Sequence, residues 1–164
     1  MQAKLHNSVS GKDSTIRTEP LANYNIIVLD QALKGRSFIT LTNTNVLRDG
    51  DERDANVTAF DFSLYDNKNL FNVKGTARYS KIFAANPYDG YNTTLRAGKV
   101  SGKWQYYLLG NIESANYDPR DLGFLQAANE MSIIKAITYS PFTPTENLLS
   151  YNYKLTTRYG KLYA

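Results

Sequence analysis

The feature that most constrains this chain is alternation of apolar and polar residues over long runs. In the run 69–81 one set of alternate positions holds Phe71, Val73, Gly75, Ala77 and Tyr79, and the other holds Asn72, Lys74, Thr76, Arg78 and Ser80. The run 148–160 repeats the pattern with Tyr151, Tyr153, Leu155, Thr157 and Tyr159 on one side. Successive side chains of a strand point to opposite faces, so a period of two predicts amphipathic β-strands.

Turn-forming residues interrupt these runs at 10–13, 66–69 and 101–102, and longer loops fall at 48–56, 84–90, 115–123 and 141–147. The intervening runs predict nine strands and then a tenth, at 2–9, 15–19, 22–30, 36–47, 56–66, 69–81, 91–100, 103–114, 131–140 and 148–160. Strands joined by short turns pair antiparallel, so the predicted fold is an all-β antiparallel meander of long amphipathic hairpins. One stretch, LQAANEMSIIKAI at 125–137, also has helical propensity, and a helix there is an open alternative.

The length of the runs favours a membrane protein. A strand that crosses a bilayer at a tilt needs about 9–11 residues, whereas the usual strand has about 5–6. Short turns that alternate with longer loops are also typical of outer-membrane barrels. We therefore expect residues 1–164 to form a single β-barrel segment, either part of a transmembrane barrel or a small complete one. A soluble β-sandwich or barrel that binds carbohydrate would show the same alternation and is the alternative function.

The polar and aromatic positions of this pattern supply the candidate site residues. Polar-face residues of the clearest strands are expected to line a lumen: Asn72, Lys74, Thr76, Arg78, Lys154 and Arg158. The chain holds 13 Tyr, 7 Phe and 1 Trp, an excess that points to an interface. Near the strand ends we expect either an aromatic girdle, which we favour, or a sugar-stacking surface, formed by Tyr88, Tyr91, Trp104 and Tyr106.

No catalytic, metal or cofactor site is predicted. The chain lacks Cys, and its single histidine, His6, is expected at the surface. The acidic loop with Asp49, Asp51, Glu52 and Asp54 lacks the ligand spacing of an EF-hand, so a solvated loop is the better interpretation. Four carboxylates could in principle supply a glycosidase pair, although nothing in the sequence singles out two of them: Asp89, Glu113, Asp118 and Asp121. We therefore expect no enzymatic activity.

Charge and the N-terminal residues constrain the partners and the context. The net charge of +4 is spread over the hairpins, which gives no indication of nucleic-acid binding. No run approaches the ~18 apolar residues of a membrane helix, so a membrane-bound form would have to span with strands. The first residues, MQAKLHNSVSGKDS, contain no apolar stretch typical of a signal peptide. We therefore expect this segment to be an internal piece of a longer exported protein.

Several long phrases of the sequence resemble one family. They are GRSFITLTNTNVLRDGDERDANVTAFDFSLYD (35–66), ARYSKIF (77–83), YDGYNTTLRAGKVSGKWQYYLLGNIES (88–114) and YDPRDLGFLQAANE (117–130). The chain is similar in these phrases to the barrel region of an envelope-protein family of Bacteroidetes-type bacteria. Members of that family join an N-terminal domain similar to family-9 carbohydrate-binding modules to a long outer-membrane barrel.

The resemblance implies a place in the outer membrane of a Gram-negative bacterium, with lipid as partner. It links the protein to carbohydrate binding or uptake only through a module that these residues do not contain, so a polysaccharide partner is implied for that module alone. The last residues, RYGKLYA, also depart from the family pattern because they lack the terminal aromatic of many outer-membrane barrels. The family implies no catalytic residue for any position here.

Overall fold

A computed structural model describes residues 2–6, 13–17, 19–121, 128–141 and 150–163. The described residues form ten strands: β1 (Gln2–His6), β2 (Asp13–Arg17), β3 (Ala22–Ala32), β4 (Phe38–Arg48), β5 (Asp54–Tyr65), β6 (Phe71–Phe83), β7 (Tyr88–Lys99), β8 (Trp104–Glu113), β9 (Glu130–Tyr139) and β10 (Tyr153–Leu162). Each predicted run overlaps one of them, with ends that differ by up to five residues. The helix alternative at 125–137 is wrong from residue 130 onward, where β9 lies, and residues 125–127 are outside the described part.

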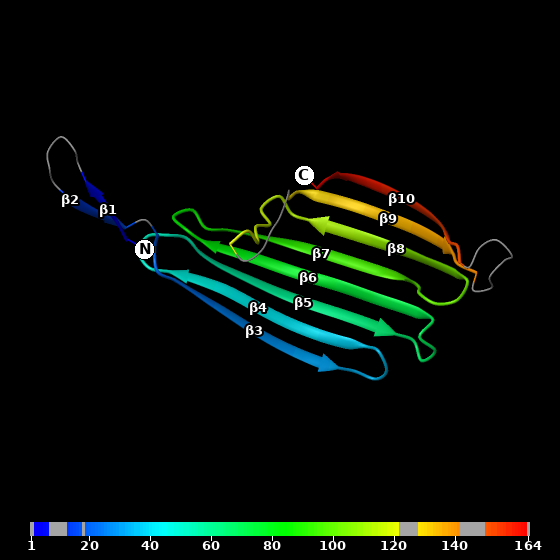
Figure 1. Ribbon diagram of the computed structural model, residues 1–164. Coiled ribbons are helices and arrows are strands. Elements are labelled where there is room, and N and C mark those ends of the chain that lie inside the picture. Colours follow the sequence, from blue (N-terminus) through cyan, green and yellow to red (C-terminus); the bar gives the residue numbers. More distant parts are fainter. Residues whose placement is uncertain (1, 7–12, 18, 122–127, 142–149, 164) are drawn as a thin grey trace.

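The strands form an open meander. Eight of them make one antiparallel sheet in the order β10-β9-β8-β7-β6-β5-β4-β3, while β1 and β2 pair only with each other (Figure 1). The predicted all-β antiparallel meander is therefore confirmed. The alternative of a small complete barrel is wrong for this chain, because β3 and β10 lie at opposite edges of the sheet and do not pair. In the part of the chain that the structure describes, no helix has the length and apolar character of a membrane span.

Turn chemistry explains two of the reversals. Between β5 and β6 the carboxylate of Asp66 accepts the N–H of Phe71 at 2.7 Å and that of Lys68 at 3.2 Å. These bonds lower the pKa of Asp66, and Asn69 takes a φ of 53° that asparagine tolerates better than most residues. Between β7 and β8, Gly102 has a φ of 90°. The predicted turns at 66–69 and 101–102 are confirmed, whereas most of the turn at 10–13 lies outside the described residues.

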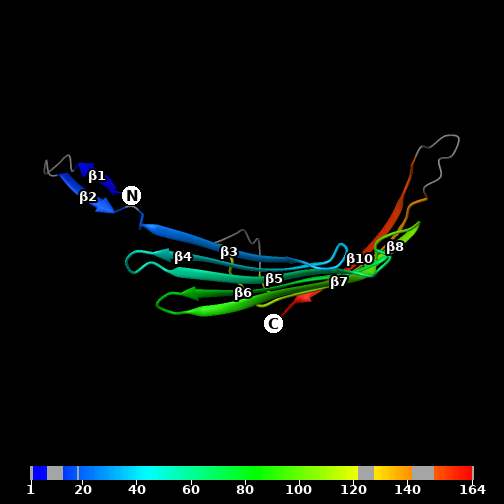
Figure 2. The same cartoon turned by 90° about the horizontal axis from the view of Figure 1, so that it is seen from below.

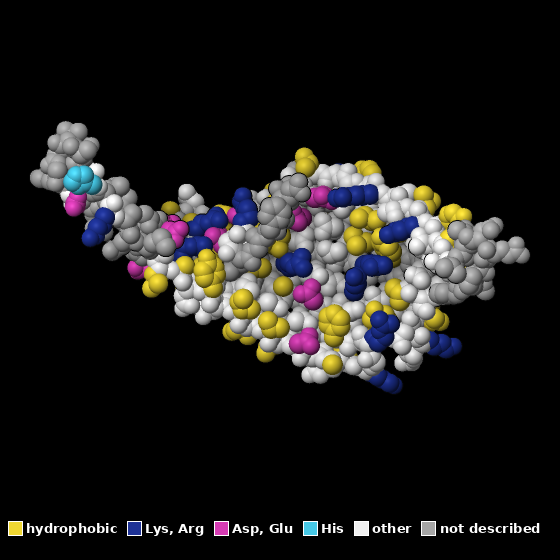
Figure 3. All heavy atoms as spheres, in the orientation of Figure 1, with side chains coloured by type: hydrophobic (Ala, Val, Ile, Leu, Met, Phe, Trp, Pro, Cys, Tyr) yellow, Lys and Arg dark blue, Asp and Glu magenta, His cyan; other side chains and the backbone are white. Residues whose placement is uncertain are grey.

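The large sheet is curved like a trough, as Figure 2 shows. Its continuous register places alternate residues on two faces, which we call the concave and the convex face. On the concave face, a polar row runs across seven strands from edge strand β3: Asp30, Thr40, Asp61, Thr76, Thr94, Asn111 and Ser132. Three adjacent pairs in this row are joined by hydrogen bonds: Thr40 donates to Asp30, Thr76 to Asp61 at 2.6 Å and Thr94 to Asn111 at 3.0 Å. Charged side chains are spread over this face (Figure 3).

The convex face carries an apolar band that crosses all eight strands. Its band consists of Ile27, Leu29, Ile39, Leu41, Phe60, Phe62, Leu64, Phe71, Val73, Ala77, Leu95, Ala97, Tyr106, Leu108, Ile112, Ile133, Ile137, Tyr139, Tyr153 and Leu155. The described residues contain no second sheet packed over this band, and large side chains such as Leu95 remain 52% exposed. A hydrophobic cluster lies at one end of the concave face, where Val46, Ala55 and Ile82 are fully buried and Ala22 and Tyr88 pack against them.

Candidate functional site on the concave face

The segment 114–121 leaves β8 and folds back over the concave face. Ser114 fixes its start, since its Oγ accepts the N–H of Tyr91 at 2.9 Å. Tyr117 is buried, and its backbone passes so close to Gly90 that a Cβ at that position would lie 2.3 Å from the Tyr117 nitrogen. Glycine at position 90 is therefore required for this close approach.

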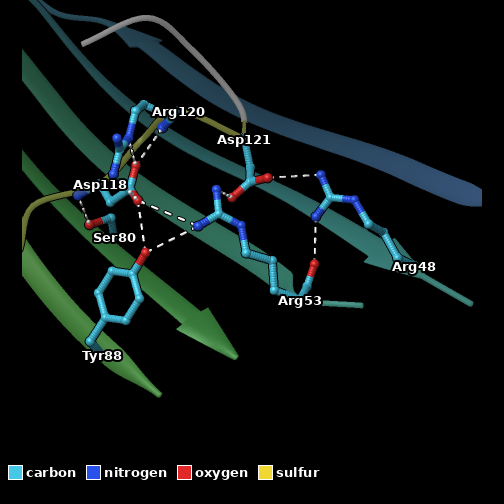
Figure 4. A network of polar contacts seen from close by, with 7 residues as sticks. All are labelled: Arg48, Arg53, Ser80, Tyr88, Asp118, Arg120 and Asp121. Atoms are coloured by element: carbon cyan, nitrogen blue, oxygen red, sulfur yellow. Dashed lines mark hydrogen bonds and ion pairs between the residues drawn. The ribbon is translucent and has the colours of Figure 1, made fainter. Parts of the chain in front are cut away.

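Asp118 is the central residue of the segment, and its carboxylate is buried. Figure 4 shows its polar contacts. Its backbone N–H donates to Ser80 Oγ at 3.0 Å, and its Oδ2 accepts the hydroxyl of Tyr88 at 2.8 Å. Arg120 donates through Nε to Oδ1 at 2.8 Å and through its terminal nitrogen to Oδ2 at 2.9 Å. The guanidinium of Arg120 holds the pKa of Asp118 well below its usual range, so this carboxylate is ionised.

Asp121 links the segment to the loop between β4 and β5. Its Oδ1 accepts Arg48 at 2.8 Å and its Oδ2 pairs with Arg53 at 2.7 Å. Arg53 also approaches Asp118 Oδ2 at 3.7 Å, and so bridges the two aspartates (Figure 4). We call Arg48, Arg53, Ser80, Tyr88, Asp118, Arg120 and Asp121 the arginine–aspartate cluster. It holds three guanidinium groups against two carboxylates and ties the segment to β4, to the loop between β4 and β5, and to β6 and β7.

The four carboxylates considered for glycoside hydrolysis do not form one site. Asp118 and Asp121 are neighbours through Arg53, but both are engaged by arginines. Glu113 is buried on the concave face of β8, where Asn92 donates to its Oε2 at 3.0 Å. Asp89 lies on the convex face. A proton donor for glycoside cleavage must be neutral at working pH, and the arginine-bound, ionised Asp118 is unsuited to that role.

The six lumen candidates share the concave face, but their surroundings differ. Asn72 is buried and donates to Ser63 Oγ at 3.0 Å, and Thr76 bonds to Asp61. Arg158 forms an ion pair with Glu130. Among the described residues no carboxylate lies within ion-pair distance of Lys74, Arg78 or Lys154.

The four aromatic candidates are divided between the faces. Tyr91, Trp104 and Tyr106 lie on the convex face, where Trp104 packs against Tyr139 with ring centroids 4.6 Å apart. The hydroxyl of Tyr91 contacts that of Tyr163 at 2.6 Å. Tyr88 instead lies on the concave face and binds Asp118. Tyr88 is therefore separate from the other three, because the alternation of side chains along β7 places Tyr88 and Tyr91 on opposite faces.

No sequence pattern indicated a role for Arg48, Arg53 or Arg120 in a site. The loop 48–56 and the loop 115–123 both combine arginine with aspartate, and this complementarity is the signal that could have paired them. The acidic residues of the first loop do not gather, and the described residues hold no group of three or more His, Asp or Glu side chains placed for a metal. His6 is exposed and contacts Asp13.

Fold and site together define a class: an open, curved antiparallel meander with a polar concave face and an apolar convex face. The chain belongs to the family described as Domain of unknown function (DUF5916), which matches residues 1–164. No curated protein and no solved structure matches it. The outer-membrane location and the carbohydrate link implied by the resemblance stay predictions.

Proposed function

We propose that this chain is a wall segment of an outer-membrane β-barrel in a Gram-negative bacterium, with the convex face against lipid and the concave face toward an aqueous lumen. The observation that carries the proposal is the position of the apolar band on the convex face. The band does not follow the cross-strand rows of the sheet but crosses them diagonally.

The register between the strands shows that the apolar band shifts along successive strands. The row that holds Leu29 and Leu41 on the first strands of the sheet ends at Lys161 on the last. The row of Leu155, Ile137 and Tyr106 reaches Phe71 on β6 and lies beyond the ends of β3 and β4. Strands of a barrel tilt by about 35–45°, so a band parallel to the membrane must shift along successive strands in this way.

The limits of the band support the same proposal. On one side lies a polar row of the convex face: Asn25, Asn45, Asn56, Lys81 and Asp89. Tyr79 and Tyr91 follow at that margin, and Trp104, Tyr139 and Tyr153 are at the opposite one. Aromatic residues at both margins of an apolar band are typical of lipid interfaces. Strands β3 to β10 have 10 to 13 residues, enough for a tilted span.

The polar character of the concave face supports the proposal that this face lines a water-filled interior. Adjacent pairs of its polar row are hydrogen-bonded, and its arginines and lysines would be costly against hydrocarbon. Carbohydrate binding is not assigned to these residues, since the resemblance implies it only for a separate module. In this proposal the chain has a structural role without catalysis.

Two adjacent residues of β7 test the proposal. Leu95 lies on the convex face and Thr94 on the concave face, and the chain has no native cysteine. In outer-membrane preparations of cells that express the protein, Thr94→Cys should react with a charged, water-soluble maleimide. Leu95→Cys should resist it, and a fluorophore attached there should be quenched by brominated lipids.

A matched pair in one strand excludes differences in expression or fold as the cause. Recovery of the protein in the soluble fraction, with Leu95→Cys protected inside a folded domain and insensitive to lipid, would instead support the carbohydrate-binding sandwich. Equal reaction of both thiols in membranes would contradict the assignment of the faces.

A further inference from the structure

A hollow on the concave face has a charge pattern that the wall function does not require. Its volume is about 580 Å³, and it lies between β4 and β8, with β6 at its centre. Lys74, Arg78 and Arg96 line it together with apolar surface from Phe38, Tyr65 and Leu109. It is separate from the arginine–aspartate cluster, whose residues do not line it.

The cations of this hollow lack carboxylate partners among the described residues. No ion pair within 4.0 Å joins Lys74, Arg78 or Arg96 to an acidic group there, whereas Arg48, Arg53, Arg120 and Arg158 all have one. The one acidic residue of the hollow, Asp61, accepts a hydrogen bond from Thr76.

Two of the cations are direct cross-strand neighbours. Lys74 on β6 pairs in register with Arg96 on β7, and both side chains are on the concave face. Like charges at directly opposed positions destabilise a sheet, so this pair favours an anion between them. Arg96 is held in place because its guanidinium stacks on the ring of Tyr107, 3.9 Å from the centroid.

The third cation sets the length of a ligand. Arg78 is four residues from Lys74 along β6, which places their Cα atoms about 13 Å apart at the rise of a strand. At this spacing the two cationic positions can be met by the two ends of one elongated molecule. An elongated molecule could place one oxyanion between Lys74 and Arg96 and a second near Arg78, with its body against Tyr65 and Leu109.

We propose that this hollow binds an elongated organic anion with two oxyanion groups. Carboxylate, sulfate and phosphate share the bidentate geometry that guanidinium groups recognise. The inference deepens the proposed function by naming the class of solute that the lumen would hold, and it rests on that function only for the route of access.

The experiment uses the full chain in detergent, with arginine side chains labelled with ¹⁵N, and suberate as the probe at constant ionic strength. We expect suberate to shift the Nε–H signals of Arg96 and Arg78, and octane-1,8-diol to leave them unchanged. Acetate should bind at least about tenfold more weakly than suberate, because it reaches only one end of the hollow. Hexane-1,6-bisphosphonate and hexane-1,6-disulfonate keep the six-methylene spacing of suberate, so repeating the titration with them ranks the oxyanions.

Variants locate the binding. Lys74→Gln and Arg78→Gln should each weaken suberate binding by about tenfold, since each removes a charge-assisted contact. Lys99→Gln removes the same charge from the convex face of β7 and should have no effect. All three positions are at the surface, and circular dichroism checks that the variants fold.

Equal weakening by Lys99→Gln, equal affinity for acetate, or absence of any shift would overturn the inference. These outcomes are independent of the lipid test, because binding is measured in detergent. If suberate does not bind in the hollow, the thiol result at Leu95 and Thr94 still stands. If the thiol test contradicts the assignment of the faces, the binding result in detergent still stands.

Discussion

Lys135 is the residue that fits the convex face least well. It lies on β9 between Leu108 of β8 and Thr157 of β10, within the apolar band. A lysine that faces lipid near the midplane of a bilayer costs about 2–4 kcal/mol, and less where its stem reaches toward the interface. The position is therefore a sensitive probe of what covers this face.

We expect Lys135→Leu to stabilise the protein in lipid vesicles by about 2–4 kcal/mol if the band meets lipid near the midplane. The free energy of unfolding, measured by urea titration in vesicles, checks this. Lys154→Leu is the control, because Lys154 belongs to the concave face and its replacement should give no comparable gain. A loss of stability in Lys135→Leu would mean that water or a polar partner covers β9.

At the scale of elements, the segment 114–121 depends on an ionised carboxylate. The folded pKa of Asp118 is below its ordinary value of about 3.9. A depressed folded pKa means that the ionised form stabilises the folded state above pH about 4, and that this contribution is lost as the pH falls further.

We therefore expect the backbone N–H of Asp118, which donates to Ser80, to lose hydrogen-exchange protection when the pH is lowered from 4 toward 2. Asp118→Asn should show the same loss at neutral pH, because the amide cannot replace the ion pairs with Arg120 and Arg53. Asp89→Asn makes the same chemical change at an exposed convex position and should leave the segment protected. Unchanged protection in Asp118→Asn would show that Tyr117 and the backbone contacts suffice to hold the segment.

For the whole molecule, the open sheet is the dominant property. Among the described residues, strands β3 and β10 each pair on one side only, and β3 exposes apolar side chains on both faces: Tyr24, Ile26, Ile27, Val28 and Leu29. Free edges beside apolar surface favour association in water. We expect the isolated chain to self-associate in detergent-free buffer and to disperse in a mild detergent, as measured by analytical ultracentrifugation. A stable monomer without detergent would contradict the exposure of both edges and the convex band.

The sequence determined the strands and their faces because alternation is a local property. The six residues predicted for one polar face do share the concave face: Asn72, Lys74, Thr76, Arg78, Lys154 and Arg158. They share it because the register is continuous from β6 through β7, β8 and β9 to β10. The turns at 66–69 and 101–102 were equally local, because asparagine and glycine tolerate positive φ.

The features that only the tertiary structure decided depend on contacts between residues far apart in the sequence. Arg48 and Asp121 are 73 positions apart, and no local pattern shows that the segment 114–121 folds inward to join them. The same holds for the opposed Lys74 and Arg96 and for the edges that leave the sheet open. Alternation fixes which residues share a face within a strand, whereas the register between strands fixes which of them meet.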